Sequence, residues 1–584
     1  MKVNIELKGF RKQSRILSVV LSVLGIILLT FFLRNVDNGV STLPLFGGAI
    51  LLAVGNVLAF LTVDDQWSNV NFVFVLYVTT FFLLVMHDIR FGILQGSDIT
   101  SEYTSSKITL TNGAWLLSRA DQGERYFSSA SVSLIPAVVS KITGLDLMPT
   151  FQWVMRLVIS VLPLAVYLAV KDIFRNVKLA ALSALIFAQL YFNFNLLAFL
   201  VRQGVAEIFL VLTIFLLVKL HQAESRSLAY VVLITLAMFG LVTSHYTLNY
   251  WSIIMVVCIF VLCFVVGVLP KKLLFLIRII NLKMEKPIIN SVFLIFFLVA
   301  TATWIYYTNL TSFLTDIRNE LYLLSPNRAV TSPVTQTSWI LNNPAGPIVG
   351  FWFNLTALLI PIGFLYVLFK VPKRSRHMPW LGGALVMLGT MALWIAAGSR
   401  MLGLFFDRIY IMGAPFFTTF MAVPLLLLDK KLKVLVILFL LVNLPLNMVL
   451  PSYQRYVLYC PEESVNPETG VVQRYIREPE FAASVWLDQY ANENVTFYTD
   501  FVETWFYARY HVSIANGEEP PTNSTYAYFV LHYYNVKHGL WQQIYSGSTM
   551  ALIVDFPVDD LLNNSSVVYS NGEVAIIAKT QIEG

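Results

Sequence analysis

Two acidic residues in one polar stretch offer the clearest opportunity for chemistry in this sequence. Asp98 and Glu102 stand four residues apart in GSDITSEYTSSKITLTNGAW. If this stretch is helical, both carboxylates lie on one face of the helix. A carboxylate can act as a general base toward a hydroxyl, and two neighbouring carboxylates can instead hold a divalent cation such as Mg²⁺ or Mn²⁺. The alternative is a solvated loop with ordinary surface acids.

Further charged and polar side chains stand in or beside long apolar runs. Ionisable residues at membrane depth are costly and usually functional. Guanidinium suits a phosphate-bearing substrate because its planar fork stays protonated. The alternatives are arginines that reach to the lipid headgroups and a histidine that is hydrogen-bonded at the interface rather than an acid or base. The candidates for substrate contact are Asp88, Arg156, Arg202, Glu207, His245, Tyr246, Arg400 and Arg408.

The composition indicates that a membrane surrounds these residues. Of the 584 residues, 57% are hydrophobic and 13% are charged; a soluble domain has about twice that charged share. This balance excludes a soluble globular enzyme, a disordered chain and a nucleic-acid-binding protein. We expect about thirteen helical spans of the hydrocarbon layer. They are 16–33, 45–63, 71–86, 149–170, 179–200, 203–219, 229–245, 250–269, 288–306, 351–369, 380–397, 409–428 and 434–450.

The distribution of Lys and Arg predicts the orientation of the chain. The net charge of +6 comes from 40 Lys and Arg against 34 Asp and Glu, and the basic residues gather in short loops. With these spans, all the basic loops fall on one side, which the positive-inside rule makes cytoplasmic. The N-terminus is then cytoplasmic and the tail extracytoplasmic. The basic segments are 2–15, 171–178, 271–286, 370–376 and 430–433.

Three regions are expected on the outer side: the loops 87–148 and 307–350 and the tail 452–584. Residues 129–145 are apolar, but a span there would invert every later loop. We therefore expect a helix that lies on the outer surface.

The tail has the pattern of a small α/β domain. EFAASVWLDQYANE and FVETWFYARYH predict helices, and NVTFYT, AYFVLHYY and MALIVDF predict strands. VVYSNGEVAIIA predicts a hairpin that turns at Asn571-Gly572. The expected fold class is therefore a mainly α-helical polytopic membrane protein with a small extracytoplasmic C-terminal α/β domain.

This plan resembles the GT-C superfamily of polytopic membrane glycosyltransferases. The similarity lies in an acid after an early span, at Asp98 in GSDITSEY, a long outer loop with a surface helix, many spans and an external α/β domain. The stretch GSDITSEYTSSKITLTNGAW also looks like that of an archaeal and bacterial membrane-protein family known mainly as a domain of unknown function. DRIYIMGAPFF resembles the Arg-then-Pro element of GT-C enzymes.

The resemblance implies a polyprenyl-phosphate sugar donor and transfer on the non-cytoplasmic face. It makes Asp98 the catalytic residue, with Glu102 beside it and Asp88 as a rival base, and it places Arg408 at the lipid phosphate. It divides the chain into two added spans at 1–70, a core at 71–451 and the external domain at 452–584. The tail lacks a WWDYG-like motif, so transfer of a preassembled glycan to Asn is not expected.

We therefore expect a multi-pass enzyme of the cell membrane. It would transfer a hexosyl or pentosyl group, with inversion, to a glycan, lipid or protein acceptor, and nucleic acid is not an expected partner. The competing class is a transporter or flippase for a lipid-linked or anionic solute, which tends to carry its site at the midplane between internal repeats. A third class is a non-catalytic scaffold of the cell envelope.

Overall fold

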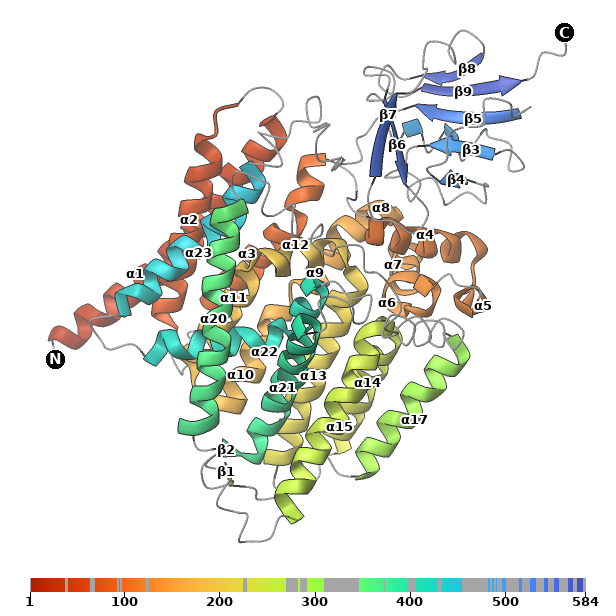
Figure 1. Cartoon of the computed structure of the whole chain (residues 1–584). Coiled ribbons are helices and arrows are strands. Elements are labelled where there is room, and N and C mark those ends of the chain that lie inside the picture. Colours follow the sequence, from red (N-terminus) through yellow and green to blue (C-terminus); the bar gives the residue numbers. More distant parts are fainter. Residues whose placement is uncertain are drawn as a thin grey trace.

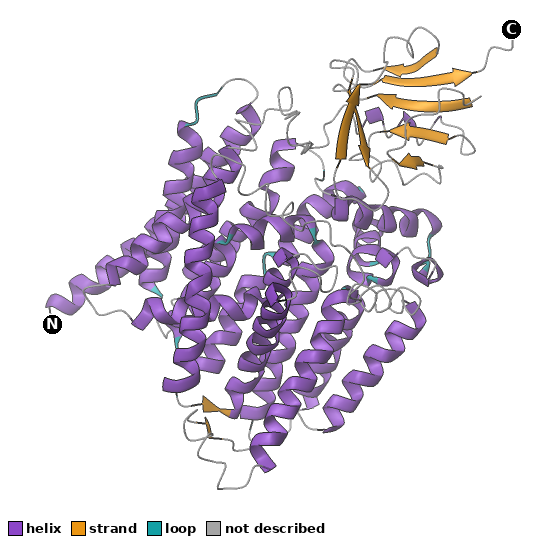
Figure 2. Ribbon diagram, viewed as in Figure 1, coloured by secondary structure: helices purple, strands orange, loops and turns teal. Residues whose placement is uncertain are grey.

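The computed structural model shows a bundle of long helices with a small β-rich domain beyond one end of it (Figure 1). Helices make up the whole bundle, and the strands gather almost entirely in the C-terminal domain (Figure 2). The structure describes residues 2–36, 40–63, 69–91, 94, 97–121, 125–223, 228–268, 282–283, 291–308, 346–371, 373–396, 406–427, 433–453, 482–483, 486–487, 490, 496–499, 514–516, 526–531, 540–544, 551–555, 566–570 and 575–580.

Long membrane helices precede and follow a continuous series of shorter elements in the first outer loop. The elements up to the middle of the chain are α1 (Lys2–Asn35), α2 (Leu43–Thr62), α3 (Val70–Phe91), α4 (Ser97–Asn112), α5 (Leu117–Asp121), η3 (Arg125–Ser128), α6 (Ala130–Ser133), α7 (Ile135–Thr143), α8 (Leu147–Pro149), η4 (Thr150–Met155), α9 (Arg156–Ile159), α10 (Leu162–Phe174), α11 (Val177–Gln189), α12 (Tyr191–Phe199) and α13 (Val201–Gln222). The later elements are α14 (Leu228–Ser244), α15 (Tyr246–Val268), α17 (Ser291–Thr308), α20 (Gly346–Lys370), η5 (Ser375–His377), α21 (Met378–Ala396), α22 (Phe406–Leu427) and α23 (Lys433–Tyr453).

The segments that were predicted to span the membrane fall on apolar helices, some of them on more than one, which confirms a mainly helical, polytopic membrane protein. In the described part of the chain, 5 helices are long and apolar enough to cross a membrane, and the other predicted spans fall on shorter apolar helices. The 5 long helices are Gln13–Asn35, Leu43–Thr62, Leu147–Phe174, Val201–Gln222 and Tyr410–Leu427.

The predicted span 179–200 is interrupted, which the hydropathy pattern does not reveal. Helix α11 ends at Gln189, Leu190 is extended (φ −70°, ψ 129°), and α12 then begins. The side chain of Asn193 donates a hydrogen bond to the Phe187 carbonyl across the break (2.8 Å). This bond satisfies one of the carbonyls that a helix end exposes, so the break is stable inside the protein.

The first two helices pack tightly against each other. A Cβ atom on Gly25 would lie 2.7 Å from the Gly48 carbonyl oxygen, and one on Gly48 would lie 2.8 Å from the Gly25 carbonyl oxygen. Only glycine permits this approach of two helix backbones. Both helices also contact α3, and α2 contacts α23. The first helices of the membrane part therefore pack against the last one along the chain (Figure 1).

The outer segment 129–145 is helical, as predicted, and its two faces differ. It forms α6 and α7, and α7 ends at Gly144 in the left-handed conformation (φ 72°). Exposed side chains of α7 recur three and four residues apart, at Ile135 (42%), Val138 (43%) and Ile142 (78%), whereas Ala137 is buried. This pattern is typical of a helix that presents an apolar face to a membrane surface.

The C-terminal domain is built on a mixed sheet. Its described order is β4-β3-β5-β9-β8; β3 is parallel to β4 and β5, and β9 is antiparallel to β5 and β8. The β5 residues Phe529–Leu531 and the β9 residues Ile576 and Ile577 form its buried centre. The predicted hairpin and the predicted strands fall on this sheet and on β7. Strands β4 and β6 were not predicted. The predicted helix FVETWFYARYH lies outside the described residues. The strands are β3 (Thr496–Thr499), β4 (Ile514–Asn516), β5 (Tyr526–Leu531), β8 (Ser566–Ser570) and β9 (Ala575–Thr580), with β6 (Leu540–Ile544) and β7 (Ala551–Asp555) as a separate antiparallel pair.

Two of the basic loops meet at the opposite end of the bundle. Strand β1 (Leu282–Lys283) pairs with β2 (Lys373–Arg374), and the pair lies at the end of the bundle away from the C-terminal domain (Figure 1). Two basic segments almost a hundred residues apart in the chain therefore lie on one side of the bundle.

Candidate active site

Helix α4 brings the two predicted acids onto one face. Asp98 lies in its first turn and Glu102 one turn later. Thr104 and Thr109 return hydrogen bonds to carbonyls one turn back in α4, which satisfies their hydroxyls without a partner outside the helix. The helix contacts the start of α13, and the two carboxylates meet α13 at that point.

The start of α13 is a natural position for a carboxylate. Leu200 is not helical (φ −126°, ψ 69°) and separates α12 from α13. The first backbone N–H groups of a helix have no partner within it and carry partial positive charge. Here Glu102 serves them: the Val201 N–H donates to its Oε2 (3.1 Å) and the Arg202 N–H to its Oε1 (3.4 Å).

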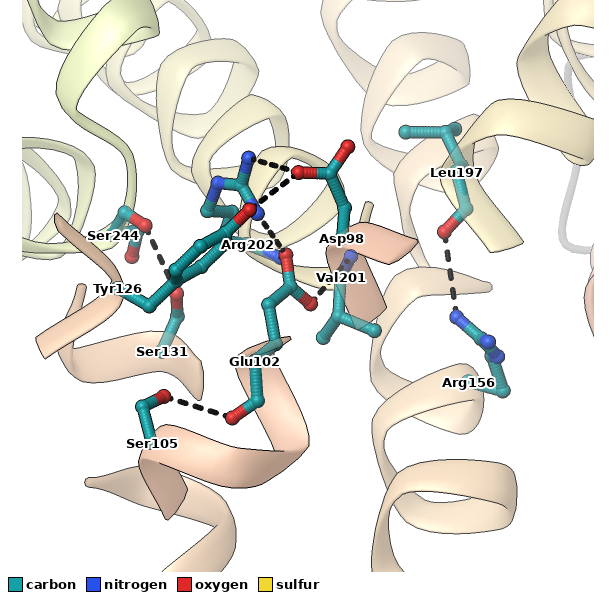
Figure 3. Close-up of polar contacts among 10 residues, drawn as sticks. All are labelled: Asp98, Glu102, Ser105, Tyr126, Ser131, Arg156, Leu197, Val201, Arg202 and Ser244. Carbon is teal, nitrogen blue, oxygen red and sulfur yellow. Dashed lines mark hydrogen bonds and ion pairs between the residues drawn. The ribbon is translucent and has the colours of Figure 1, made fainter. Parts of the chain in front are cut away.

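Arg202 joins the two acids, as Figure 3 shows. Its Nη1 lies 2.6 Å from Glu102 Oε1, and its Nη2 lies 3.1 Å from Asp98 Oδ1. The Arg202 residue is fully buried, so these ion pairs operate with little water around them and are stronger than surface pairs. We call Asp98, Glu102 and Arg202 the clamp.

Two tyrosines complete the surroundings of the clamp. The Tyr126 hydroxyl donates to Asp98 Oδ1 (2.7 Å), and the guanidinium carbon of Arg202 lies 4.6 Å from the Tyr126 ring centre and 5.7 Å from that of Tyr246. Burial raises the pKa of Tyr126 above its usual range, so its hydroxyl stays a donor. Tyr126 was not among the predicted site residues, because nothing in GERYFSS sets it apart from other tyrosines.

A second buried ion pair lies at the other side of the helix break. Arg156 Nε is 3.6 Å from Asp88 Oδ2, and Arg156 Nη1 donates to the Leu197 carbonyl (3.4 Å). Leu197 is in the last turn of α12, where carbonyls lack helical partners and a cation is favourable. The break between α12 and α13 is therefore bracketed by a cation at the end of one helix and an anion at the start of the next.

The remaining predicted residues lie in separate settings. Glu207 is buried in α13 and accepts a hydrogen bond from the side chain of Gln203, one turn earlier (2.9 Å). His245 precedes α15, and its Nδ1 accepts the Leu248 N–H (3.0 Å), so it caps that helix. Arg408 lies in the first turn of α22, and its side chain and the whole of Arg400 are outside the described residues.

Solvent access differs among the three acids that are candidates for the general base. The side chain of Asp98 is 17% exposed, compared with 3% for Asp88 and 0% for Glu102. A general base must reach the proton that it removes. Asp98 meets that requirement better than the other two. Glu102 accepts hydrogen bonds from the first N–H groups of α13, and Asp88 forms an ion pair with Arg156.

The clamp does not fit a divalent cation. Three of the four carboxylate oxygens, Oδ1 of Asp98 and both oxygens of Glu102, already accept hydrogen bonds from Arg202, Tyr126 and Val201. Within the described ranges, no group of three or more His, Cys, Asp and Glu side chains is placed to hold a metal ion. Such ions need several oxygen ligands.

The burial of Glu102 predicts a pH dependence of stability. Burial raises the pKa of this carboxyl from 4.5 to about 7, against the opposing effect of Arg202. Between these values the folded protein holds a proton that the unfolded chain has released, so stability should fall as the pH rises from 5 to 7. Thermal denaturation in detergent across this range measures it. Glu102→Gln has no such proton, so an equally steep fall in this variant would contradict the assignment.

Comparisons with known proteins were made on sequence and on structure. No protein-family model matches the sequence, and no curated protein matches it. Among solved structures, the apo oligosaccharyltransferase of Archaeoglobus fulgidus is similar over 81% of this chain and 71% of its own, with 12% identity and a TM-score of 0.48. The oligosaccharyltransferase AglB from the same organism, in complex with an inhibitory peptide and a dolichol-phosphate, is similar over 85% and 76%, with 12% identity and a TM-score of 0.46. A likeness at this level of identity and TM-score carries no functional argument.

Proposed function

We propose that the protein is a membrane glycosyltransferase that moves a sugar from a polyprenyl-phosphate donor to an acceptor hydroxyl on the extracytoplasmic face. The observation that carries the proposal is a partly exposed carboxylate, Asp98, fixed by a buried arginine at the end of a membrane bundle. The donor class comes from the motif resemblance to GT-C enzymes. The extracytoplasmic assignment follows from the basic loops at the opposite end.

The reaction we propose is a single displacement. Asp98 takes the proton of the acceptor hydroxyl, whose oxygen attacks the anomeric carbon as the bond from that carbon to the phosphate oxygen breaks. Attack from the opposite face inverts the configuration. Most of the rate comes from holding the two substrates in line and from fixed charges around them.

The arginines divide the electrostatic work in this proposal. Arg202 fixes the position of Asp98 through its Nη2 contact. Because Arg202 is fully buried, it acts on the leaving phosphate through its charge rather than through a direct contact. Arg408, at the start of α22, is the second group we assign to the leaving phosphate. The loop 307–350 and the C-terminal domain would shape the acceptor site.

The test uses the purified protein in lipid vesicles with a panel of polyprenyl-phosphate monosaccharides and a panel of glycan, lipid and peptide acceptors that carry hydroxyl groups. Consumption of one donor, with release of the polyprenyl phosphate, is the expected result. Donor movement between leaflets without release of the sugar would instead establish the competing flippase. If the protein neither consumes nor binds any of the donors, the proposal is contradicted.

Tyr126→Phe tests the support of Asp98. It removes a hydrogen bond to a charged group, worth about 1.5–3 kcal/mol, but keeps the ring against Arg202. We expect kcat to fall roughly tenfold to a hundredfold with a smaller change in the KM for the donor, measured from initial rates. Tyr77→Phe is the matched control, because that hydroxyl donates to the Leu157 carbonyl on the exposed surface. Equal kcat values for both variants would remove Tyr126 from the mechanism.

A further inference from the structure

The two carboxylates of the clamp bind one positive charge between them, as the carboxylate ligands of a metal site do. Asp98 and Glu102 project from successive turns of α4 toward one point, and the guanidinium of Arg202 occupies that point (Figure 3). The two nitrogen–oxygen distances, 2.6 Å to Glu102 and 3.1 Å to Asp98, are those of charge-assisted hydrogen bonds. One fixed cation therefore bridges two carboxylates.

The neighbours of the clamp favour a guanidinium over a metal ion. Glu102 Oε2 receives the Val201 N–H and Asp98 Oδ1 receives the Tyr126 hydroxyl, so donors already surround the carboxylates. The rings of Tyr126 and Tyr246 face Arg202. Aromatic faces suit a planar, weakly hydrated cation, whereas Mg²⁺ keeps several waters and requires oxygen ligands.

We infer that Arg202 is the resident cation of this site: it occupies the position between Asp98 and Glu102 that a divalent metal would otherwise take, and the site works without metal. The first part of the inference stands independently of the proposed function, and the second part rests on it. Removal of the guanidinium should then create a metal site, because a buried and a partly exposed carboxylate face each other without a counter-charge.

The test measures Mn²⁺ binding to the full-length protein in nanodiscs at pH 8, by electron paramagnetic resonance. The wild type should show no saturable binding. Arg202→Met should bind one Mn²⁺ at least roughly a hundredfold more tightly than the wild type does, because the positive charge of Arg202 no longer repels the metal at close range. The double variant Asp98→Asn/Arg202→Met should lose this binding. Arg119→Met, which removes a guanidinium from neighbouring α5, should behave as the wild type.

Two results would overturn the inference. One is saturable Mn²⁺ binding by the wild type that Asp98→Asn abolishes; this measurement decides the matter even if Arg202→Met does not fold. The other is a folded Arg202→Met that binds Mn²⁺ no better than the wild type. Measurements of turnover distinguish this inference from the proposed function. An active wild type should keep its rate in EDTA, and a rate that depends on metal would overturn the second part of the inference. If no donor is consumed at all, the result counts against the proposed function alone.

Discussion

Asp98→Asn is expected to lower the rate of sugar transfer by roughly a thousandfold, within the range that general bases contribute. The amide keeps the size of the carboxylate and can still accept the Tyr126 hydroxyl, so the fold should survive. It cannot take the acceptor's proton. Initial rates of donor consumption in vesicles, together with donor affinity, measure the effect. We expect nearly unchanged donor affinity, because the loss concerns the chemical step.

Asp172→Asn is the control for Asp98→Asn. It also removes a carboxylate from an ion pair, but its partner is Lys219, and both residues lie near the cytoplasmic ends of their helices by our orientation. Its transfer rate should stay close to that of the wild type. A wild-type rate for Asp98→Asn would exclude Asp98 as the base and leave Asp88 and Glu102 as candidates.

Arg156→Met is expected to destabilise the protein by about 3–5 kcal/mol, because it leaves a buried carboxylate without its partner. Asp88 and Arg156 are both almost fully buried, and water cannot replace the lost contact. The substitution also removes the donor to the Leu197 carbonyl at the end of α12. Thermal denaturation in a mild detergent, followed by loss of the monodisperse species, measures the change.

The double variant Asp88→Asn/Arg156→Met shows whether the loss comes from the unpaired charge. It removes the carboxylate as well as the guanidinium, so much of the stability should return. If Arg156→Met is as stable as the wild type, Asp88 is neutral in the folded protein and the ion pair does not stabilise it. If the double variant is as unstable as the single one, the bond to Leu197 dominates.

The membrane helices could be predicted because the cost of exposing polar groups to lipid acts on each segment by itself. A run such as 45–63 is apolar apart from Asn56 and Thr62, and it needs no distant residue to become helix α2. The break inside the predicted span 179–200 could not be predicted in this way, because Leu190 is as apolar as a residue of a continuous span. The break at Leu200 falls between two predicted spans, but the side chains that stabilise it come from the distant helices α4 and α9.

The candidate site, too, could be predicted only in the part that depends on local sequence. The sequence by itself determined the membrane class of the protein, the positions of its spans and the alignment of Asp98 with Glu102, because hydropathy and helical spacing are local properties of the chain. Only the tertiary structure decided that Arg202, 104 residues from Asp98, would bridge the two acids and that Tyr126, 28 residues away, would bind the same oxygen. Pairing of buried charges depends on which distant segments meet, and the packing of the whole bundle sets those meetings.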